Sequence, residues 1–185
     1  MKIIGITGTI GAGKGTIVDY LQSHYGFAHY SVRGFLIDII KKRNLPVNRD
    51  SMVIVANELR ANHSPSYIVE QLYEQAKANG QDAIIESVRT VGEVTALREK
   101  PNFHLFAIDA DPKVRYERIV IRASETDHIS YETFLENEAR EMTSTDPNKQ
   151  NLAECQRLAD YKFDNNTSFE ALYSQIEKAL YVIGK

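Results

Sequence analysis

The 185-residue sequence contains no tryptophan, a single cysteine and no long apolar run. Because Cys155 has no partner in the chain, an internal disulfide is excluded, which is typical of a reducing compartment, and we expect a cytoplasmic location. No apolar stretch reaches the roughly 18 residues of a membrane span, and the N-terminus lacks the pattern of a signal peptide. The sequence therefore predicts no membrane partner.

An excess of positive charge is missing as well. Lysine and arginine number 22 against 25 aspartate and glutamate residues, and no basic block occurs. Nucleic acids are bound mainly through basic patches that neutralise phosphates, so we expect no nucleic-acid partner. The hydrophobic fraction of 43% is typical of a globular protein. The length suits one well-buried domain, residues 1–185, rather than two.

A glycine-rich loop follows the first apolar run. Its spacing fits G-x-x-x-x-G-K, in which glycines let backbone N–H groups point at an anion and the lysine reaches the β- and γ-phosphates. A helix that begins near Lys14 would add the positive end of its dipole. A dinucleotide-binding loop fits less well, because Thr16 replaces its third glycine. We predict that a nucleoside triphosphate binds Gly8, Thr9, Ile10, Gly11, Ala12, Gly13, Lys14, Gly15 and Thr16.

Short apolar runs alternate with helical segments along the chain. We expect helices to begin at Ser64-Pro65 and Asp111-Pro112, and capping boxes at Thr90-x-x-Glu93 and Thr167-x-x-Glu170. Continuous apolar runs suit strands that are buried on both faces of a parallel sheet. The sequence therefore predicts an α/β protein, a three-layer α/β/α sandwich, with five parallel strands at 2–7, 27–31, 83–86, 103–109 and 161–165.

Two long excursions interrupt this alternation. Residues 32–79 are too many for one crossover helix and read as helices near 32–43, 49–62 and 65–79. A second excursion follows a helix near 112–122. Because ligands bind beyond the carboxyl ends of parallel strands, we expect 32–79 to be an acceptor-binding insertion and 123–149 to be a short lid. The core then comprises 1–31, 80–122 and 150–185.

Charged residues after the strand ends are candidates for phosphoryl transfer, which needs mainly positioning and charge neutralisation. Glu86 ends an apolar strand and, with Thr16, is expected to hold Mg²⁺ through water, although it also fits a solvent-facing strand end. Arg89 can form a bidentate pair with a substrate phosphate. Arg33 and Arg60 are further acceptor-binding candidates, and each also fits a solvated surface arginine.

Three arginines share one face of the helix near 112–122. Arg118 and Arg122 lie closest to the predicted lid, and Arg140 on the returning helix would meet them from the other side. A lid that carries arginines brings positive charge to the transferring group and excludes water. For Arg115 we expect a surface position in an amphipathic helix.

These motifs resemble those of adenylate kinase and related P-loop nucleoside monophosphate kinases. Gly-Lys-Gly-Thr at 13–16 is the usual form of their phosphate loop, and Arg89-Thr90 is similar to the pair that binds the acceptor's phosphate. The acidic-Gly-x-Pro-Arg turn of that family is here Glu86-Ser-Val-Arg89. The resemblance implies lid-entry roles for Arg118 and Arg122, a lid role for Arg140, acceptor contacts for Ser31 and Arg33, and donor-base contacts for Asn165 and Asn166.

The chain also resembles the dephospho-coenzyme A kinase branch and its uncharacterised archaeal-type relatives. The shared patterns are Asn-Glu-Leu-Arg at 57–60 and Ala-Asp-Tyr at 159–161. Two features separate the chain from true dephospho-coenzyme A kinases. Gly15 replaces their serine after the lysine, and no Asp-Ala-Asp follows the second strand.

The sequence thus predicts an enzyme that uses ATP and Mg²⁺ to phosphorylate a nucleoside or deoxynucleoside monophosphate. Its partners would be small-molecule nucleotides. One alternative is a hydroxyl acceptor, as in dephospho-coenzyme A, with Asp38 or Glu86 as the base. A further alternative is a regulatory module that binds a nucleotide without transfer. The expected catalytic residues are Lys14, Arg89, Arg118, Arg122 and Arg140.

Overall fold

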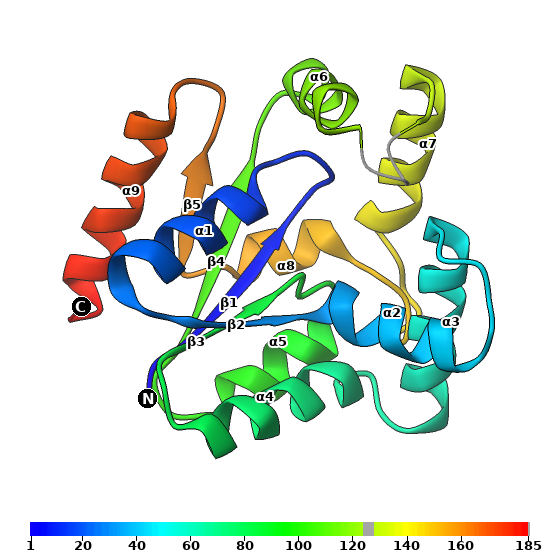
Figure 1. The fold of residues 1–185 in the computed structure, drawn as a ribbon, viewed down its shortest axis with the longest axis horizontal. Coiled ribbons are helices and arrows are strands. Elements are labelled where there is room, and N and C mark those ends of the chain that lie inside the picture. Colours follow the sequence, from blue (N-terminus) through cyan, green and yellow to red (C-terminus); the bar gives the residue numbers. More distant parts are fainter. Residues whose placement is uncertain (124–127, 185) are drawn as a thin grey trace.

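A computed structural model describes residues 1–123 and 128–184. Within these residues the strands form one sheet in the order β2-β3-β1-β4-β5, and each neighbouring pair is parallel (Figure 1). The predicted α/β sandwich with five parallel strands is confirmed. The strands are β1 (Ile3–Gly8), β2 (Ala28–Ser31), β3 (Ala83–Glu86), β4 (Phe103–Asp109) and β5 (Tyr161–Asp164).

Helices cover both faces of the sheet. One face packs against α1 and α9 through residues such as Leu21 and Ile176, and the other packs against α2 to α5 and α8. No helix in the described part of the chain is long and apolar enough to cross a bilayer. The helices are α1 (Lys14–Tyr25), α2 (Val32–Lys42), α3 (Arg49–Asn62), α4 (Tyr67–Asn79), α5 (Val91–Arg98), α6 (Pro112–Arg122), α7 (Tyr131–Met142), α8 (Leu152–Leu158) and α9 (Phe169–Val182).

The N-caps of α4, α5 and α9 can be compared with the caps that the sequence predicts. Thr90 and Glu93 form the predicted capping box of α5. The box predicted at Thr167 is wrong, because Ser168 is the N-cap of α9 and its hydroxyl accepts from the backbone N–H of Ala171. The start predicted at Ser64-Pro65 is also wrong, since α4 begins at Tyr67 after Ser66. The sequence therefore predicted that a hydroxyl residue caps each of these helices, but it placed the cap one or two residues too early where several hydroxyl residues lie close together.

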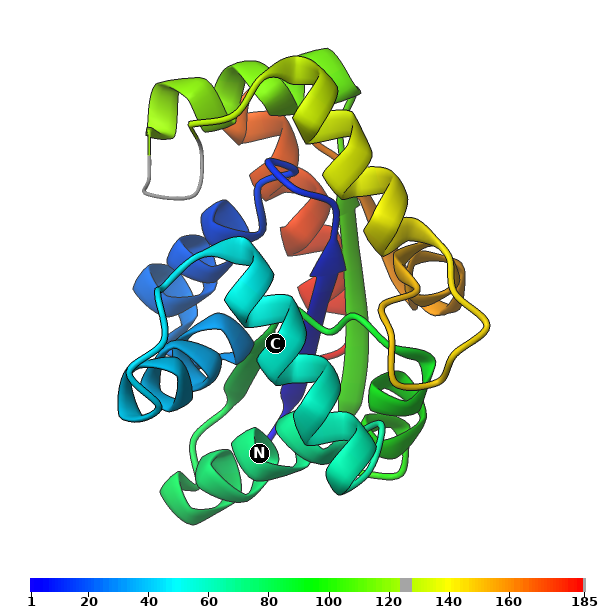
Figure 2. The same cartoon turned by 90° about the vertical axis from the view of Figure 1, so that its right-hand side faces the viewer.

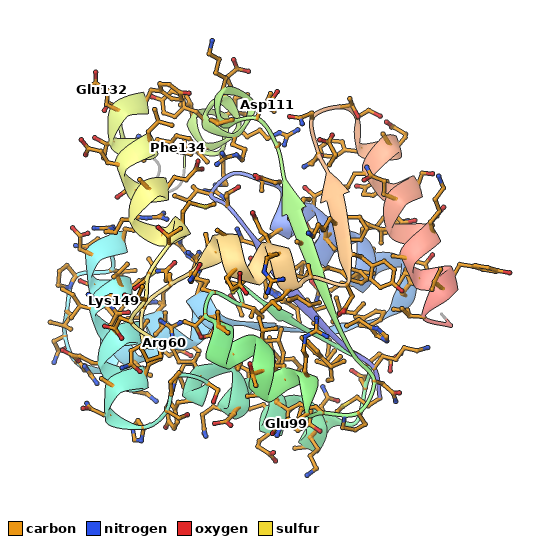
Figure 3. The ribbon with its side chains drawn as sticks, turned by 180° about the vertical axis from the view of Figure 1, so that it is seen from behind. Arg60, Glu99, Asp111, Glu132, Phe134 and Lys149 are labelled. Atoms are coloured by element: carbon orange, nitrogen blue, oxygen red, sulfur yellow. The ribbon has the colours of Figure 1, made fainter. Side chains whose placement is uncertain are left out.

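The second excursion and helices α2 and α3 of the first lie at the carboxyl ends of the strands, whereas α4 packs against one face of the sheet. Figure 2 shows α6 and α7 side by side above the end of β1, with α2 and α3 beside it. Phe134 of α7 is fully buried and, with Ile119 and Ile10, forms a small core that joins α6, α7 and the loop after β1 (Figure 3). Part of the predicted lid, residues 124–127, lies outside the described residues. Helices α2, α3, α6 and α7 therefore lie around the glycine-rich loop.

Candidate active site

The loop between β1 and α1 has a backbone that requires glycine at two positions. Gly11 and Gly13 have φ angles of 75° and 106°, in the left-handed region. A Cβ at Gly13 would lie 2.3 Å from Nδ2 of Asn165, and one at Gly11 would lie 2.5 Å from the carbonyl oxygen of Arg115. Gly15 differs, because it lies in α1 with open space around it. The tight turn therefore depends on Gly11 and Gly13.

The loop lysine lies folded over its own loop. Nζ of Lys14 donates to the carbonyl oxygens of Gly8 at 2.9 Å and Thr9 at 2.8 Å. Burial, together with the nearby charge of Arg89, lowers the pKa of Lys14 to about 8. A bound phosphate would replace these carbonyl oxygens as the lysine's acceptor and favour its charged form.

Residues from distant parts of the chain brace the loop from outside. Nδ2 of Asn165 donates to the carbonyl oxygen of Ala12 at 2.8 Å, and Nη2 of Arg118 donates to the carbonyl oxygen of Asn165 at 2.7 Å. Arg115 is buried and donates to the carbonyl oxygen of Ile10 at 3.2 Å, so the surface position expected for it is wrong. Asn165 and Arg118 thus support the loop in this structure.

Beside the loop lies a cleft between the strand ends, α2, α3 and α7. Its volume of about 150 Å³ is below the ~300–1,000 Å³ of pockets that enclose a whole drug-sized ligand, so it encloses part of a nucleotide at most. One end is charged and the other is apolar. The cleft is lined by Ile10, Gly11, Lys14, Val32, Arg33, Leu36, Arg49, Met52, Val53, Ala56, Arg60, Glu86, Ser87, Arg89, Arg122, Glu141 and Gln150.

Two arginines at the charged end share one buried carboxylate. Glu141 accepts from Nη2 of Arg49 at 2.5 Å and from Nη1 of Arg89 at 2.7 Å. The amide oxygen of Gln150 also accepts from Arg89, at 2.8 Å. Burial opposes ionisation of Glu141, but the charges of Arg89 and Arg49 outweigh it and lower the pKa of the carboxyl. The arrangement holds two guanidinium groups ready for an anion.

Glu86 also lies in the cleft, at the end of β3. Its Oε2 lies 3.2 Å from Nε2 of His29, and the hydroxyl of Ser87 donates to its Oε1 at 3.3 Å. Burial opposes its ionisation, but the hydrogen bond to His29 and the charge of Lys14 lower the pKa overall. An ionised carboxylate and the Thr16 hydroxyl at the start of α1 are the hard oxygen ligands that Mg²⁺ prefers. Glu86 therefore has the chemistry of a magnesium ligand beside the loop, and Thr16 lies outside the lining of the cleft.

The structure separates the other predicted residues into two groups. Arg33, Arg60 and Arg122 line the cleft together with Lys14 and Arg89. Ser31, Arg140 and Asn166 lie outside its lining and hold other contacts. The hydroxyl of Ser31 caps α2, Arg140 is exposed and donates to Asp50 at 3.4 Å, and the side-chain oxygen of Asn166 accepts from the backbone N–H of Asp111.

Sequence reasoning missed three residues of the charged end, which are Arg49, Glu141 and Gln150. A signal for Arg49 was present, because Arg49, Met52, Ala56 and Arg60 recur on one helical face. Glu141 and Gln150 carried no such pattern. They reach Arg89 only because the chain folds back between α7 and α8.

Comparisons with known proteins agree with this geometry. The sequence profile of a family described as AAA domain matches residues 4–146. The chain belongs to this family. Like the AAA domains, it carries the nucleotide-binding P-loop, here at residues 8–16. The resemblance to P-loop kinases is confirmed for the fold.

The sequence and structure matches of this chain cover nearly its whole length. It is 29% identical to a UPF0200 protein of Methanococcus maripaludis over 180 residues, which cover 96% of this chain and 94% of that protein. Its structure is similar to TT1252 from Thermus thermophilus, with a TM-score of 0.68, 18% identity and coverage of 100% and 98%. Shikimate kinase from Bacteroides thetaiotaomicron has a TM-score of 0.56 at 12% identity, with coverage of 100% and 99%. These structural likenesses establish a P-loop kinase fold.

Proposed function

We propose that this protein is an ATP-dependent kinase that phosphorylates the phosphate group of a nucleoside or deoxynucleoside monophosphate. One observation carries the proposal: the P-loop lysine Lys14 and the paired arginines Arg49 and Arg89 line the same cleft. Lysine and arginine are the side chains that bind phosphates, the latter through bidentate contacts. The donor phosphates on the loop and an acceptor phosphate on the arginines would then lie side by side.

The carboxylate of Glu141 supports the phosphate assignment. It places two oxygens against Arg49 and Arg89, much as two oxygens of a phosphate monoester would. Behind this charged end, Val32 and Leu36 of α2 and Val53 of α3 offer an apolar surface on which a base can lie. An acceptor with a phosphate at one end and a planar ring at the other matches both parts of the cleft.

The reaction needs no side-chain base. An oxygen of the acceptor phosphate, ionised at neutral pH, attacks the γ-phosphorus of ATP, and the bond from that phosphorus to the β-bridging oxygen breaks to release ADP. Lys14 and the loop N–H groups stabilise the donor charge, while Arg89 and Arg49 orient the acceptor. Magnesium held near Glu86 and Thr16 would neutralise phosphate charge. We propose Arg122, Arg118 and Arg140 as lid arginines that approach the transferring group on closure.

A hydroxyl acceptor is the second candidate. Phosphorylation of dephospho-coenzyme A would need a carboxylate base in the cleft. Of the two carboxylates expected for this role, Glu86 lines the cleft, whereas Asp38 is exposed on α2 and does not line it. Glu86 would then have to serve as the base while paired with His29. A phosphate acceptor avoids that demand.

An ADP-release assay across nucleoside monophosphates, their deoxy forms and dephospho-coenzyme A tests the proposal. We expect turnover with a monophosphate, and its loss by more than 100-fold in Lys14→Met. Lys113→Met, which changes an exposed lysine of α6, is the matched control and should stay active. Turnover of dephospho-coenzyme A alone would favour the second candidate. Tight ATP binding without transfer to any acceptor would favour the regulatory module.

A further inference from the structure

At the apolar end of the cleft, Arg60 of α3 is buried in an ion pair. Only 2% of Arg60 is exposed, and its Nε and Nη2 donate to Oε1 of Glu93 at 3.1 and 2.8 Å. Figure 3 shows Arg60 between α3 and α5, the helix that carries Glu93. Its third nitrogen, Nη1, has no hydrogen-bond partner in the part of the chain that the structure describes. Arg60 nevertheless lines the cleft.

Glu93 is itself held in place by the backbone at the start of α5, so it fixes the position of the Arg60 guanidinium. Its Oε2 accepts from the backbone N–H groups of Arg89 at 2.7 Å and Thr90 at 3.1 Å, so both carboxylate oxygens are engaged. Nε uses its one N–H group and Nη2 one of its two N–H groups for Glu93, whereas both N–H groups of Nη1 remain for a ligand. The ion pair also cancels the charge of Arg60. A neutral oxygen therefore suits Nη1 better than a second phosphate.

The face of α3 that lines the cleft has one arginine at each end. Arg49 and Arg60 are three helical turns apart, which separates their Cα atoms by roughly 16 Å at about 1.5 Å per residue. Met52, Val53 and Ala56 lie between them on α3 and line the apolar part of the cleft. A ligand whose phosphate is bound at Arg49 and Arg89 would direct its far end toward Arg60.

We infer that Arg60 selects acceptor bases with a carbonyl oxygen at their far edge, which are 6-oxopurines and 4-oxopyrimidines. The inference rests on the proposed function. A guanidinium only donates hydrogen bonds, so a carbonyl oxygen pairs with Nη1. Adenine and cytosine carry an amino group at the corresponding position, and that group is itself a donor. Two donors facing each other in a buried site leave both unpaired, which disfavours the amino bases.

Matched acceptor pairs test this inference. Inosine and adenosine monophosphates differ at C6 of the purine, and uridine and cytidine monophosphates differ at C4 of the pyrimidine. We expect the wild-type protein to favour the oxo member of each pair in kcat/KM, and in binding measured by calorimetry, on the order of 10- to 100-fold. Preference for adenosine over inosine monophosphate would overturn the inference, as would equal use of both.

Two variants assign the preference to the guanidinium. Glu93→Gln keeps Arg60 and a side-chain oxygen at the helix cap, and should retain the preference for oxo bases. The double variant Arg60→Met with Glu93→Gln removes the guanidinium without leaving a lone buried carboxylate, and should reduce the preference to within about threefold of unity. If the double variant does not fold, as judged by circular dichroism, the wild-type ratios still decide.

The outcomes separate this inference from the proposed function. If no monophosphate binds and none is phosphorylated, the proposed function is wrong and the base selection falls with it. If monophosphates are phosphorylated without regard to the oxo group, the proposed function stands and only the role of Arg60 is wrong. If the double variant keeps the full wild-type preference, another group reads the base.

Discussion

Nη1 of Arg89 donates to Oε2 of Glu141 at 2.7 Å, although 52 residues separate them in the chain. The same carboxylate accepts from Arg49, so the crossover after β3, the start of α3 and the end of α7 meet at one side chain. Because the two arginines line the cleft, the group that links the three segments also holds the proposed acceptor site in shape.

Replacing this carboxylate should destabilise the protein. Glu141→Gln leaves two largely buried arginines without their counter-charge, and we expect a loss of about 2–4 kcal/mol in the free energy of unfolding at pH 7, measured by urea denaturation. Glu154→Gln removes a carboxylate from the exposed pair with Arg157 and serves as the control, with little change expected. An unfolding midpoint unchanged by Glu141→Gln would contradict the role of Glu141.

The difference in stability between wild type and Glu141→Gln should depend on pH. The pKa of Glu141 is lowered in the folded protein from its ordinary value of 4.5. Its contribution to stability is therefore fully present above about pH 4.5 and is lost as the pH falls through the lower folded value. We expect the difference in unfolding free energy between wild type and Glu141→Gln to shrink between pH 5 and pH 3. A difference that stays constant over this range would contradict the assignment.

Donor binding should weaken in alkaline solution. The pKa of Lys14 is lowered to about 8, so the free protein loses this positive charge as the pH rises through 8. Bound phosphate favours the charged lysine, and we expect the Kd for ATP to rise by up to about tenfold per pH unit above pH 8. Calorimetry in buffers of different ionisation enthalpy should detect proton uptake on binding near pH 8. Lys14→Met should abolish both effects, and equal wild-type Kd values at pH 7 and 9.5 would refute the prediction.

A conservative change tests the proposed role of Arg49 in acceptor binding separately from that of Arg89. Arg49→Lys keeps a positive charge but loses the planar pair of donors, so we expect KM for the acceptor monophosphate to rise about 10- to 100-fold while KM for ATP stays within about twofold. Steady-state kinetics with each substrate varied in turn measure the split. Arg43→Lys, which changes an exposed arginine paired with Glu58, is the matched control. A rise in KM for ATP alone would place Arg49 on the donor side.

Two glycines of the loop should respond in opposite directions to alanine. At Gly13, with a φ of 106°, a Cβ would meet Asn165, so Gly13→Ala should destabilise the protein and weaken ATP binding. At Gly15, a Cβ meets nothing within 4 Å in a helical turn, so Gly15→Ala should raise the free energy of unfolding by about 0.5–1 kcal/mol. Thermal unfolding and ATP titration of both variants check this pair. Equal losses in both would contradict the backbone argument.

Much of the fold could be predicted because it depends on local patterns. Apolar runs predicted β3 and β4 with their observed bounds, and proline after Asp111 marked the start of α6. The capping error at Thr167 arose because Ser168 can make the same hydrogen bond one residue later. Side-chain partners could not be predicted in this way. In the sequence Arg60 fitted both an acceptor-binding arginine and a solvated surface arginine, and its partner Glu93, 33 residues further along the chain, could not be predicted.

The amino-acid sequence by itself determined the phosphate loop, the parallel sheet and the presence of arginines after the strand ends. Each of these follows from periodicity and spacing within a few residues, where the backbone alone limits the choices. Only the tertiary structure decided which arginines share the cleft with Lys14. Arg49 and Arg89 converge there because Glu141 returns from α7 to hold both, and Arg118 supports the loop because Asn165 lies behind it. A buried charge must find its counter-charge wherever the folded chain brings one, and sequence spacing carries no record of that distance.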